Sequence, residues 1–161
     1  MLRRSLLALA ILAVLPAASL AEPFTAYGPQ FGFTSGPDQF FVGGHLKWGG
    51  VAEQLDFVPG IDLGFGDNST IVSLNGDFHY RFATKTSWRP YLGGGIGIHF
   101  VSVDNSGPSP DNNDTVTGGH FIVGADVLAK GGNRFFTELK LGFSDNSPDM
   151  KVGAGFNFAA R

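Results

Sequence analysis

The sequence predicts an all-β fold, an eight-stranded antiparallel up-and-down transmembrane β-barrel. Three observations lead to it. Apolar and polar residues alternate with period 2 in eight segments, most of these segments are about 9–13 residues long, and aromatic side chains gather at the segment ends. A tilted strand needs about 9–11 residues to cross a bilayer, whereas strands of soluble domains centre on about 5–6 residues. The lengths therefore favour a membrane barrel.

The first 21 residues have the organisation of a secretory signal peptide. A short basic start, MLRR, precedes an apolar run from Leu6 to Leu15, and Ser19-Leu20-Ala21 forms a small-x-small cleavage site. The apolar run is shorter than the roughly 20 residues of a membrane-spanning helix. We expect cleavage after Ala21, export of the chain, and one barrel domain over residues 22–161.

Composition excludes some classes of partner. Cleavage would remove Arg3 and Arg4 from the 11 Lys and Arg residues, so nine basic residues would face 14 acidic ones, a net charge of −5. An acidic chain without a basic cluster is unlike a nucleic-acid-binding protein. The chain has no cysteine, so it lacks the disulfides on which small exported soluble domains often depend.

The alternation divides the mature chain into eight expected strands, in order. They are 27–35, 38–48, 57–66, 70–82, 88–101, 116–128, 134–144 and 150–160. With a periplasmic N-terminus, the connections 49–56, 83–87 and 129–133 are periplasmic, and Gly36-Pro37, 67–69, 102–115 and 145–149 lie outside. The longest connection then falls outside, as in outer-membrane barrels.

Each strand has one apolar row and one row of polar residues or glycine. In 38–48, Phe40, Val42, Leu46 and Trp48 alternate with Phe41, Gly43, His45 and Lys47. In 70–82, Val72, Leu74, Phe78, Tyr80 and Phe82 alternate with Ser73, Asn75, Asp77, His79 and Arg81. Segments 88–101 and 134–144 repeat this arrangement. The pattern fits a soluble barrel with an apolar core as well as a membrane barrel with an apolar exterior.

The positions of the aromatic residues favour the membrane alternative. Rings that line the headgroup regions should form two belts, one at each end of the strands. One group lies at the outer ends: Phe33, Phe40, Phe65, Phe100, Phe121 and Phe143. The other lies at the periplasmic ends: Trp48, Phe57, Tyr80, Phe82, Trp88, Phe135 and Phe158. A soluble barrel would need no such belts.

With the apolar rows outside, the charged rows point into the lumen. They comprise His45, Lys47, Asp62, Asp77, His79, Arg81, Arg89, His99, His120, Asp126, Arg134, Glu138, Lys140 and Lys151. An eight-stranded barrel has an interior just wide enough for its own side chains. Buried charges must pair or stay hydrated, so we expect a satisfied network that blocks any wide solute pathway.

The final strand carries the most specific motif. In KVGAGFNF, Lys151, Gly153, Phe156 and Phe158 follow a polar-x-Gly-x-x-aromatic-x-aromatic pattern. This motif, with the aromatic-Arg-Pro-Tyr start and glycine-rich continuation of WRPYLGGGIGIHF at 88–100, resembles the outer membrane protein β-barrel domain family, the small eight-stranded OmpA/OmpX-like, porin-family barrels. The resemblance covers 27–161. It implies recognition by the barrel-assembly machinery through the four motif residues, although Ala159, Ala160 and Arg161 follow where a terminal Phe is usual.

The sequence offers only weak signals for catalysis or metal binding. His99 and Ser102, with Asp104 beyond, are the nearest approach to a base and a nucleophile. His99 is expected in the lumen, however, and Ser102 begins a loop, so the pair lacks the geometry of a catalytic site. His99 and His120, with Asp111 and Asp114 between them, contain metal-ligating types without a compact motif. Gly93-Gly94-Gly95 lacks the helix and Lys-Ser/Thr of a phosphate loop. We therefore assign no catalytic residue, metal or cofactor.

The sequence thus indicates a structural, adhesive or surface-interaction role in the outer membrane. We expect a monomer in contact with outer-membrane lipids and lipopolysaccharide. The outer loops should carry the role; they contain seven carboxylates and no Lys or Arg: Asp38, Asp67, Asp104, Asp111, Asp114, Asp145 and Asp149. A lipid A-modifying barrel enzyme and a narrow low-conductance channel remain the alternatives.

Overall fold

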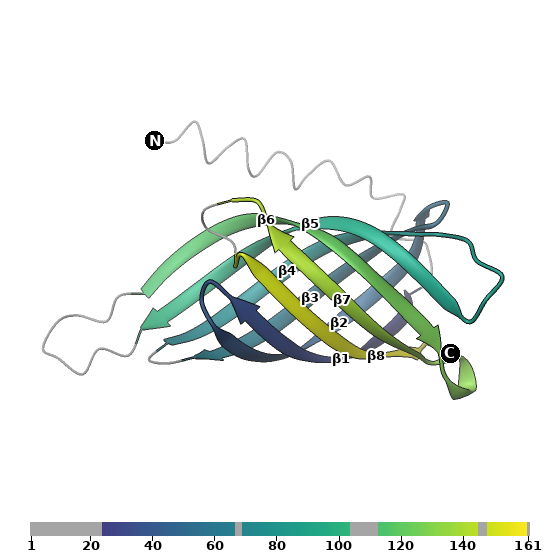
Figure 1. Cartoon of the computed structure of the whole chain (residues 1–161), viewed down its shortest axis with the longest axis horizontal. Coiled ribbons are helices and arrows are strands. Elements are labelled where there is room, and N and C mark those ends of the chain that lie inside the picture. Colours follow the sequence, from purple (N-terminus) through teal and green to yellow (C-terminus); the bar gives the residue numbers. More distant parts are fainter. Residues whose placement is uncertain (1–23, 67–68, 104–112, 145–147, 161) are drawn as a thin grey trace, which may run out of the picture.

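A computed structural model of the protein describes residues 24–66, 69–103, 113–144 and 148–160 (Figure 1). In these residues the chain forms a closed barrel of eight strands in sequence order. They are β1 (Phe24–Ser35), β2 (Gln39–Ala52), β3 (Leu55–Gly66), β4 (Ser69–Arg81), β5 (Trp88–Val103), β6 (Asn113–Leu128), β7 (Arg134–Gly142) and β8 (Met150–Ala159). A 3₁₀ turn, η2 (Lys130–Gly132), precedes β7.

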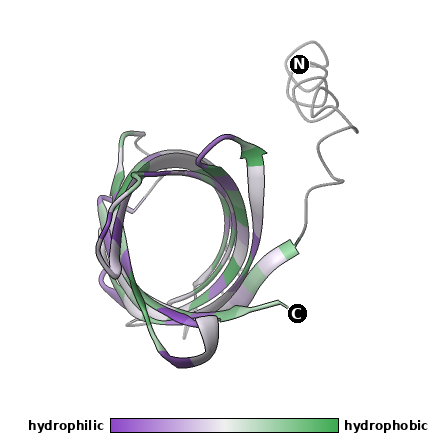
Figure 2. Ribbon diagram, turned by 90° about the vertical axis from the view of Figure 1, so that its right-hand side faces the viewer, coloured by the Kyte–Doolittle hydropathy of each residue, from purple (hydrophilic) through white to green (hydrophobic). Residues whose placement is uncertain are grey.

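Antiparallel pairing runs around the whole ring. Each strand pairs with its successor, and β8 closes the ring against β1 through a register that places Gln30 opposite Gly155. Figure 2 shows the closed ring from one end. The predicted fold class is confirmed. The predicted signal peptide, residues 1–21, lies outside the described residues, and no helix within the described ranges is long and apolar enough to cross a membrane.

Several strand ends differ from those expected. The predicted connection at 49–56 is wrong, because β2 continues to Ala52, β3 begins at Leu55, and Glu53 and Gln54 alone join them. Gln54 has a φ of 64°, a left-handed conformation that closes this short turn. The register between β2 and β3 shifts between Trp48 and Ala52, and Gly49 and Gly50 in this stretch carry no side chain, so an alternation of side chains does not reveal the extension of the strand.

Other ends move by a few residues. The strand expected from residue 27 begins at Phe24, whose ring lies 5.6 Å from that of Trp48. The long outer connection is shorter than expected, since β5 reaches Val103 and β6 starts at Asn113. The seventh strand ends at Gly142 instead of residue 144. All eight expected strands are present.

The barrel has two distinct ends. The loop end holds the connections after β1, β3, β5 and β7, and the terminus end holds the connections after β2, β4 and β6 together with the first residue of β1 and the last of β8. In Figure 1 the loop end is at the left and the C-terminus and η2 are at the right.

The apolar surface lies outside and the polar surface inside. Exposed large side chains include Phe33 at 65% and Ile96 at 58%, whereas Asp56 and Asp126 are 0% exposed. Hydrophobic and hydrophilic bands alternate along the strands in Figure 2. All four histidines are buried, as predicted. A soluble barrel would have the reverse distribution, so the alternative of an apolar core is wrong.

The aromatic belts predicted for the two ends point outward. At the loop end the ring centroids of Phe33 and Phe40 are 5.4 Å apart, and those of Phe121 and Phe143 are 4.8 Å apart. At the terminus end Trp48 lies in the same belt as Phe24. None of the 13 belt residues named from the sequence is buried. Neighbouring rings contact each other across strands, which stabilises a sheet in addition to any membrane contact.

Candidate functional site

The lumen is the candidate functional site, because it gathers nearly every buried polar group of the described chain. It divides along the barrel axis into a chamber at the loop end, a packed middle section, and a chamber at the terminus end. The three regions have volumes of about 230, 20 and 430 Å³. The middle section has room for little more than one water molecule. The two chambers are therefore separate.

Tyr91 has the largest side chain in the middle section. Its hydroxyl donates to Glu138 Oε2 at 3.0 Å, and its ring stacks on that of His79 with 4.6 Å between centroids. A Cβ at Gly124 would lie 2.5 Å from the Tyr91 hydroxyl oxygen, so glycine is required for the ring to lie against β6. The glycine-rich inner row therefore makes room for a large side chain to cross the lumen.

Two carboxylates and a lysine complete this barrier. Lys140 forms ion pairs with Asp77 and with Glu138, the latter at 3.5 Å. His120 Nε2 lies 2.8 Å from the other oxygen of Asp77. Each buried charge thus has a partner of opposite charge, as the sequence predicted. Low exposure of Lys140 and Asp77 makes these contacts stronger than surface ion pairs, although removing either partner would leave a buried charge.

The loop-end chamber is organised around Asp62 on β3. Gln30 Nε2 donates to Asp62 Oδ1 at 2.6 Å, Asn75 Nδ2 donates to Oδ2 at 2.8 Å, and Lys151 forms an ion pair with the same carboxylate. The Lys151 ammonium also lies 3.9 Å from the centroid of the Phe41 ring. One cation and two neutral amides therefore satisfy this carboxylate.

The catalytic alternative considered from sequence is not assembled. His99 points into the loop-end chamber and is buried, whereas Ser102 is exposed three residues further along β5 and thus on the opposite face. Asp104 lies outside the described residues. His99 Nδ1 instead lies 2.8 Å from Ser73 Oγ on β4. No described carboxylate hydrogen-bonds to His99, so this pair lacks the orienting acid of a hydrolytic triad.

The structure also brings no metal ligands together in the described residues. His120 faces the same chamber as His99, but its Nε2 is engaged by Asp77. No group of three or more His, Asp or Glu side chains in the described ranges could hold a metal ion. Of the two loop carboxylates considered with the histidines, Asp114 is exposed and Asp111 lies outside the described residues.

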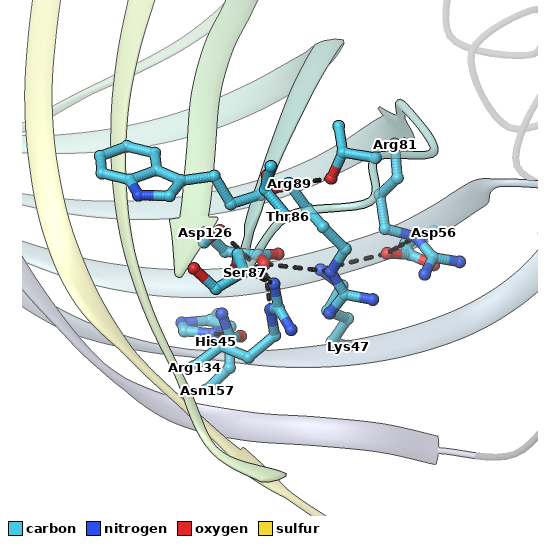
Figure 3. Close-up of polar contacts among 12 residues, drawn as sticks. His45, Lys47, Asp56, Arg81, Thr86, Ser87, Arg89, Asp126, Arg134 and Asn157 are labelled. Atoms are coloured by element: carbon cyan, nitrogen blue, oxygen red, sulfur yellow. Dashed lines mark hydrogen bonds and ion pairs between the residues drawn. The ribbon is translucent and has the colours of Figure 1, made fainter. Parts of the chain in front are cut away.

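The terminus-end chamber has a different chemistry (Figure 3). Asp56 forms ion pairs with Lys47, whose Nζ lies 3.1 Å from the carboxylate, and with Arg81, whose Nε lies 2.8 Å from it. Asp126 receives Arg89 Nε at 3.3 Å and also Arg134. Each carboxylate is shared by two cations, so each group carries one excess positive charge.

Backbone contacts fix one of these cations. Arg134 Nη2 donates to the carbonyl oxygen of Ser87 at 3.0 Å. This contact ties the start of β7 to the connection between β4 and β5. Arg134 is therefore held by two elements, whereas Arg89 contacts Asp126 alone among the described residues.

Sequence reasoning missed Asp56. It preceded the expected strand 57–66, so it was counted with a connection, yet it lies in β3 with its side chain inside. Its spacing was a usable signal. Side chains an even number of residues apart on a strand share a face, and Asp56 is six residues before Asp62, so it belongs to the same inner row. The ion pairs with Lys47 and Arg81 explain why the ladder extends to this residue.

The four residues of the C-terminal motif divide between the two faces of β8. Lys151 and Gly153 face the lumen, and Phe156 and Phe158 are exposed at 40% and 38%. The motif therefore supplies one internal ion pair and two rings of the outer surface. Its recognition by an assembly machinery stays a prediction.

Comparisons with known proteins establish the fold. No protein-family model matches the chain, and no curated protein matches it. Among solved structures, Neisserial surface protein A (NspA) matches with a TM-score of 0.65 and 15% identity over 85% of this chain and 96% of that one. The N-terminal β-barrel domain of Pseudomonas aeruginosa OprF matches with a TM-score of 0.63 and 16% identity over 85% and 95%. A de novo designed transmembrane β-barrel matches with a TM-score of 0.57 and 16% identity over 86% and 98%. The chain is thus similar in fold to small membrane barrels.

Proposed function

We propose that this protein is an outer-membrane barrel with a closed lumen that acts through the surface of its loop end. The observation that carries the proposal is the inverted distribution of residues, with large apolar side chains outside and paired charges inside. An exposed apolar surface around the whole barrel would cause a soluble monomer to aggregate. In a bilayer the same surface meets acyl chains, and the aromatic belts meet the headgroups.

The closed lumen argues against transport as the main role. The middle section separates the two chambers with Tyr91, Glu138 and Lys140, all buried and bonded to one another or to neighbours. Passage of a solute would require several of these contacts to break together. We therefore propose a structural, adhesive or surface-interaction role in preference to a channel.

We place the loop end outside the cell, where its acidic surface would meet other molecules. Asp38, Asp114 and Asp149 are exposed there. Such a rim repels anions and attracts divalent cations, an effect screened over about 10 Å at 0.1 M salt. We further propose that the C-terminal motif is read by the assembly machinery, and that lipopolysaccharide and other lipids surround a monomer.

Membrane fractionation tests the location. The protein should enter the outer-membrane fraction with a mature N-terminus at Glu22, and it should run with heat-modifiable mobility on gels. Recovery from the soluble periplasmic fraction after osmotic shock would contradict the proposal.

Planar-bilayer recording tests the closed lumen. The purified protein should give no large, stable conductance. Deletion of residues 104–112, which join β5 to β6, should leave the barrel folded while removing binding to surface partners, because a connection between strands tolerates change better than a paired strand. Stable large channels from the unmodified protein would contradict the closed lumen, and unchanged surface binding after the deletion would contradict the loop role.

A further inference from the structure

The terminus-end chamber holds more positive than negative charge. Four cations line it, and the carboxylates of Asp56 and Asp126 are the buried anions beside them. The cations are Lys47, Arg81, Arg89 and Arg134. These six groups give a net charge of +2. Positive charges that share one chamber repel each other, and an anion between them would relieve that repulsion.

Two of the four cations have unused donors. Arg81 and Arg89 each form an ion pair with a carboxylate through Nε, and among the described residues no hydrogen bond involves their terminal guanidinium nitrogens. Their side chains are 27% and 34% exposed, whereas both aspartates are 1% exposed. The carboxylates are therefore enclosed, while the guanidinium groups face the open space of the chamber.

The sheet register places the two arginines near each other. Arg81 on β4 pairs with Tyr91 on β5, and Arg89 lies two residues from Tyr91. Such diagonal neighbours on antiparallel strands are about 7–8 Å apart at Cα. Two arginine side chains that start from Cα atoms at this spacing can reach opposite sides of one tetrahedral anion. The fork of N–H donors on arginine matches phosphate and carboxylate geometry.

The chamber is also large enough for a ligand. Its volume of about 430 Å³ falls in the usual range of small-molecule sites, about 300–1,000 Å³. Asn157 lines the same wall, and its Oδ1 is engaged by His45, which leaves the amide NH₂ as a further donor. The walls therefore present donors and positive charge toward one space.

We propose that the terminus-end chamber binds a phosphate group between the guanidinium groups of Arg81 and Arg89. A phosphate monoester carries about −1.5 to −2 charges at pH 7, which matches the excess charge of the chamber better than a single carboxylate does. The phosphate could belong to a soluble molecule or to a lipid headgroup, and both share this chemistry. The proposal does not depend on the role of the loop end.

Calorimetry with inorganic phosphate tests the proposal on the folded protein in a non-ionic detergent at 0.15 M NaCl. We expect one site per barrel. The double variant Arg81→Gln/Arg89→Gln removes both guanidinium groups that have unused donors. The ion pairs of Lys47 with Asp56 and of Arg134 with Asp126 remain. It should weaken phosphate binding at least ~10-fold, because two charge-assisted contacts are lost.

A matched control removes two charges from the same end without touching the chamber. Lys85 and Lys130 are exposed in connections of the terminus end, and Lys85→Gln/Lys130→Gln should change the affinity less than ~2-fold because distant exposed charges are screened. Absence of binding to the unmodified protein, or equal loss in both double variants, would overturn the proposal.

Two further measurements keep the test decisive. If the arginine variant fails to fold, the unmodified protein should still bind phosphate at least ~10-fold more tightly than acetate, because the dianion matches the excess charge; equal affinities would overturn the proposal. Retention of phosphatidic acid from mixed micelles, lost on adding inorganic phosphate, would assign the site to lipid headgroups. Binding of inorganic phosphate without lipid retention would assign it to soluble phosphates.

Discussion

The two ends of the lumen satisfy a buried aspartate in opposite ways. At the loop end Asp62 receives one lysine and two neutral amides, from Gln30 and Asn75. At the terminus end Asp126 receives two arginines. Both arrangements enclose the carboxylate, but the first leaves its surroundings neutral and the second leaves them positive. Buried charges are thus paired at both ends of the lumen, but the net charge differs between the ends: it is neutral around Asp62 and positive around Asp126.

Removing a carboxylate should expose this difference most strongly. Asp126→Asn leaves Arg89 and Arg134 without a counter-charge, and we expect a loss of about 3–5 kcal/mol in the free energy of unfolding. Asp62→Asn leaves only one cation, Lys151, without a counter-charge, and the remaining amide oxygen can still accept a hydrogen bond from Gln30 or Asn75, so we expect a smaller loss, about 1–3 kcal/mol. Urea unfolding in liposomes measures both. Equal losses would show that the two ends do not differ.

The wall that encloses both chambers provides the next test. Leu74→Arg places a charge on the outer face of β4, where Leu74 is 43% exposed, and should cost roughly 2–4 kcal/mol near the bilayer midplane. Ser73→Arg, its inward neighbour, should be tolerated better if the new side chain finds a partner in the loop-end chamber. Unfolding in liposomes should separate the two variants; a larger loss for Ser73→Arg would reverse the assignment of the faces.

The barrier between the chambers can be loosened without removing a charge. Tyr91→Phe deletes the hydroxyl that donates to Glu138 at 3.0 Å and keeps the ring. A buried carboxylate that loses one donor costs about 1–3 kcal/mol, so the unfolding free energy should fall by that amount. Conductance should stay low because the ring still fills the lumen. Tyr91→Ala, which removes the ring as well, serves as the comparison. If Tyr91→Phe raised the conductance as much as Tyr91→Ala, the hydroxyl and not the ring would close the pathway.

Much of this architecture could be predicted from the sequence, because the face of a strand on which a side chain lies depends only on its position in the local alternation. Alternation placed His45, Asp77 and Lys140 on the row opposite to Phe33, and the aromatic belts then indicated that the row of Phe33 faces outward. The partners did not follow. Lys151 reaches Asp62 across 89 residues of sequence, and that contact depends on the stagger of strands around a closed ring.

The candidate site shows the same limit. His99 was associated with Ser102 because the two are close in sequence, yet the pleat sends them to opposite faces and cross-strand register brings Ser73 to His99. The excess charge at the terminus end was also missed, since a single total for the lumen hides how charges divide along its axis. Sequence therefore predicts which side chains enter the lumen more readily than which of them meet.

The smallest expected effect distinguishes the two ends most directly. Arg89→Gln removes a 34% exposed cation from Asp126 and leaves Arg134 in place. Its ion pair contributes little, and its loss relieves repulsion, so the unfolding free energy should change by less than about 0.5 kcal/mol. Lys151→Gln takes the single cation from Asp62 and should cost about 1–3 kcal/mol, since the carboxylate stays buried with neutral donors. The comparison in liposomes needs both variants at the same ionic strength. A loss for Arg89→Gln as large as that for Lys151→Gln would mean that both arginines are needed to hold Asp126, and that the terminus end has no cation to spare for a ligand.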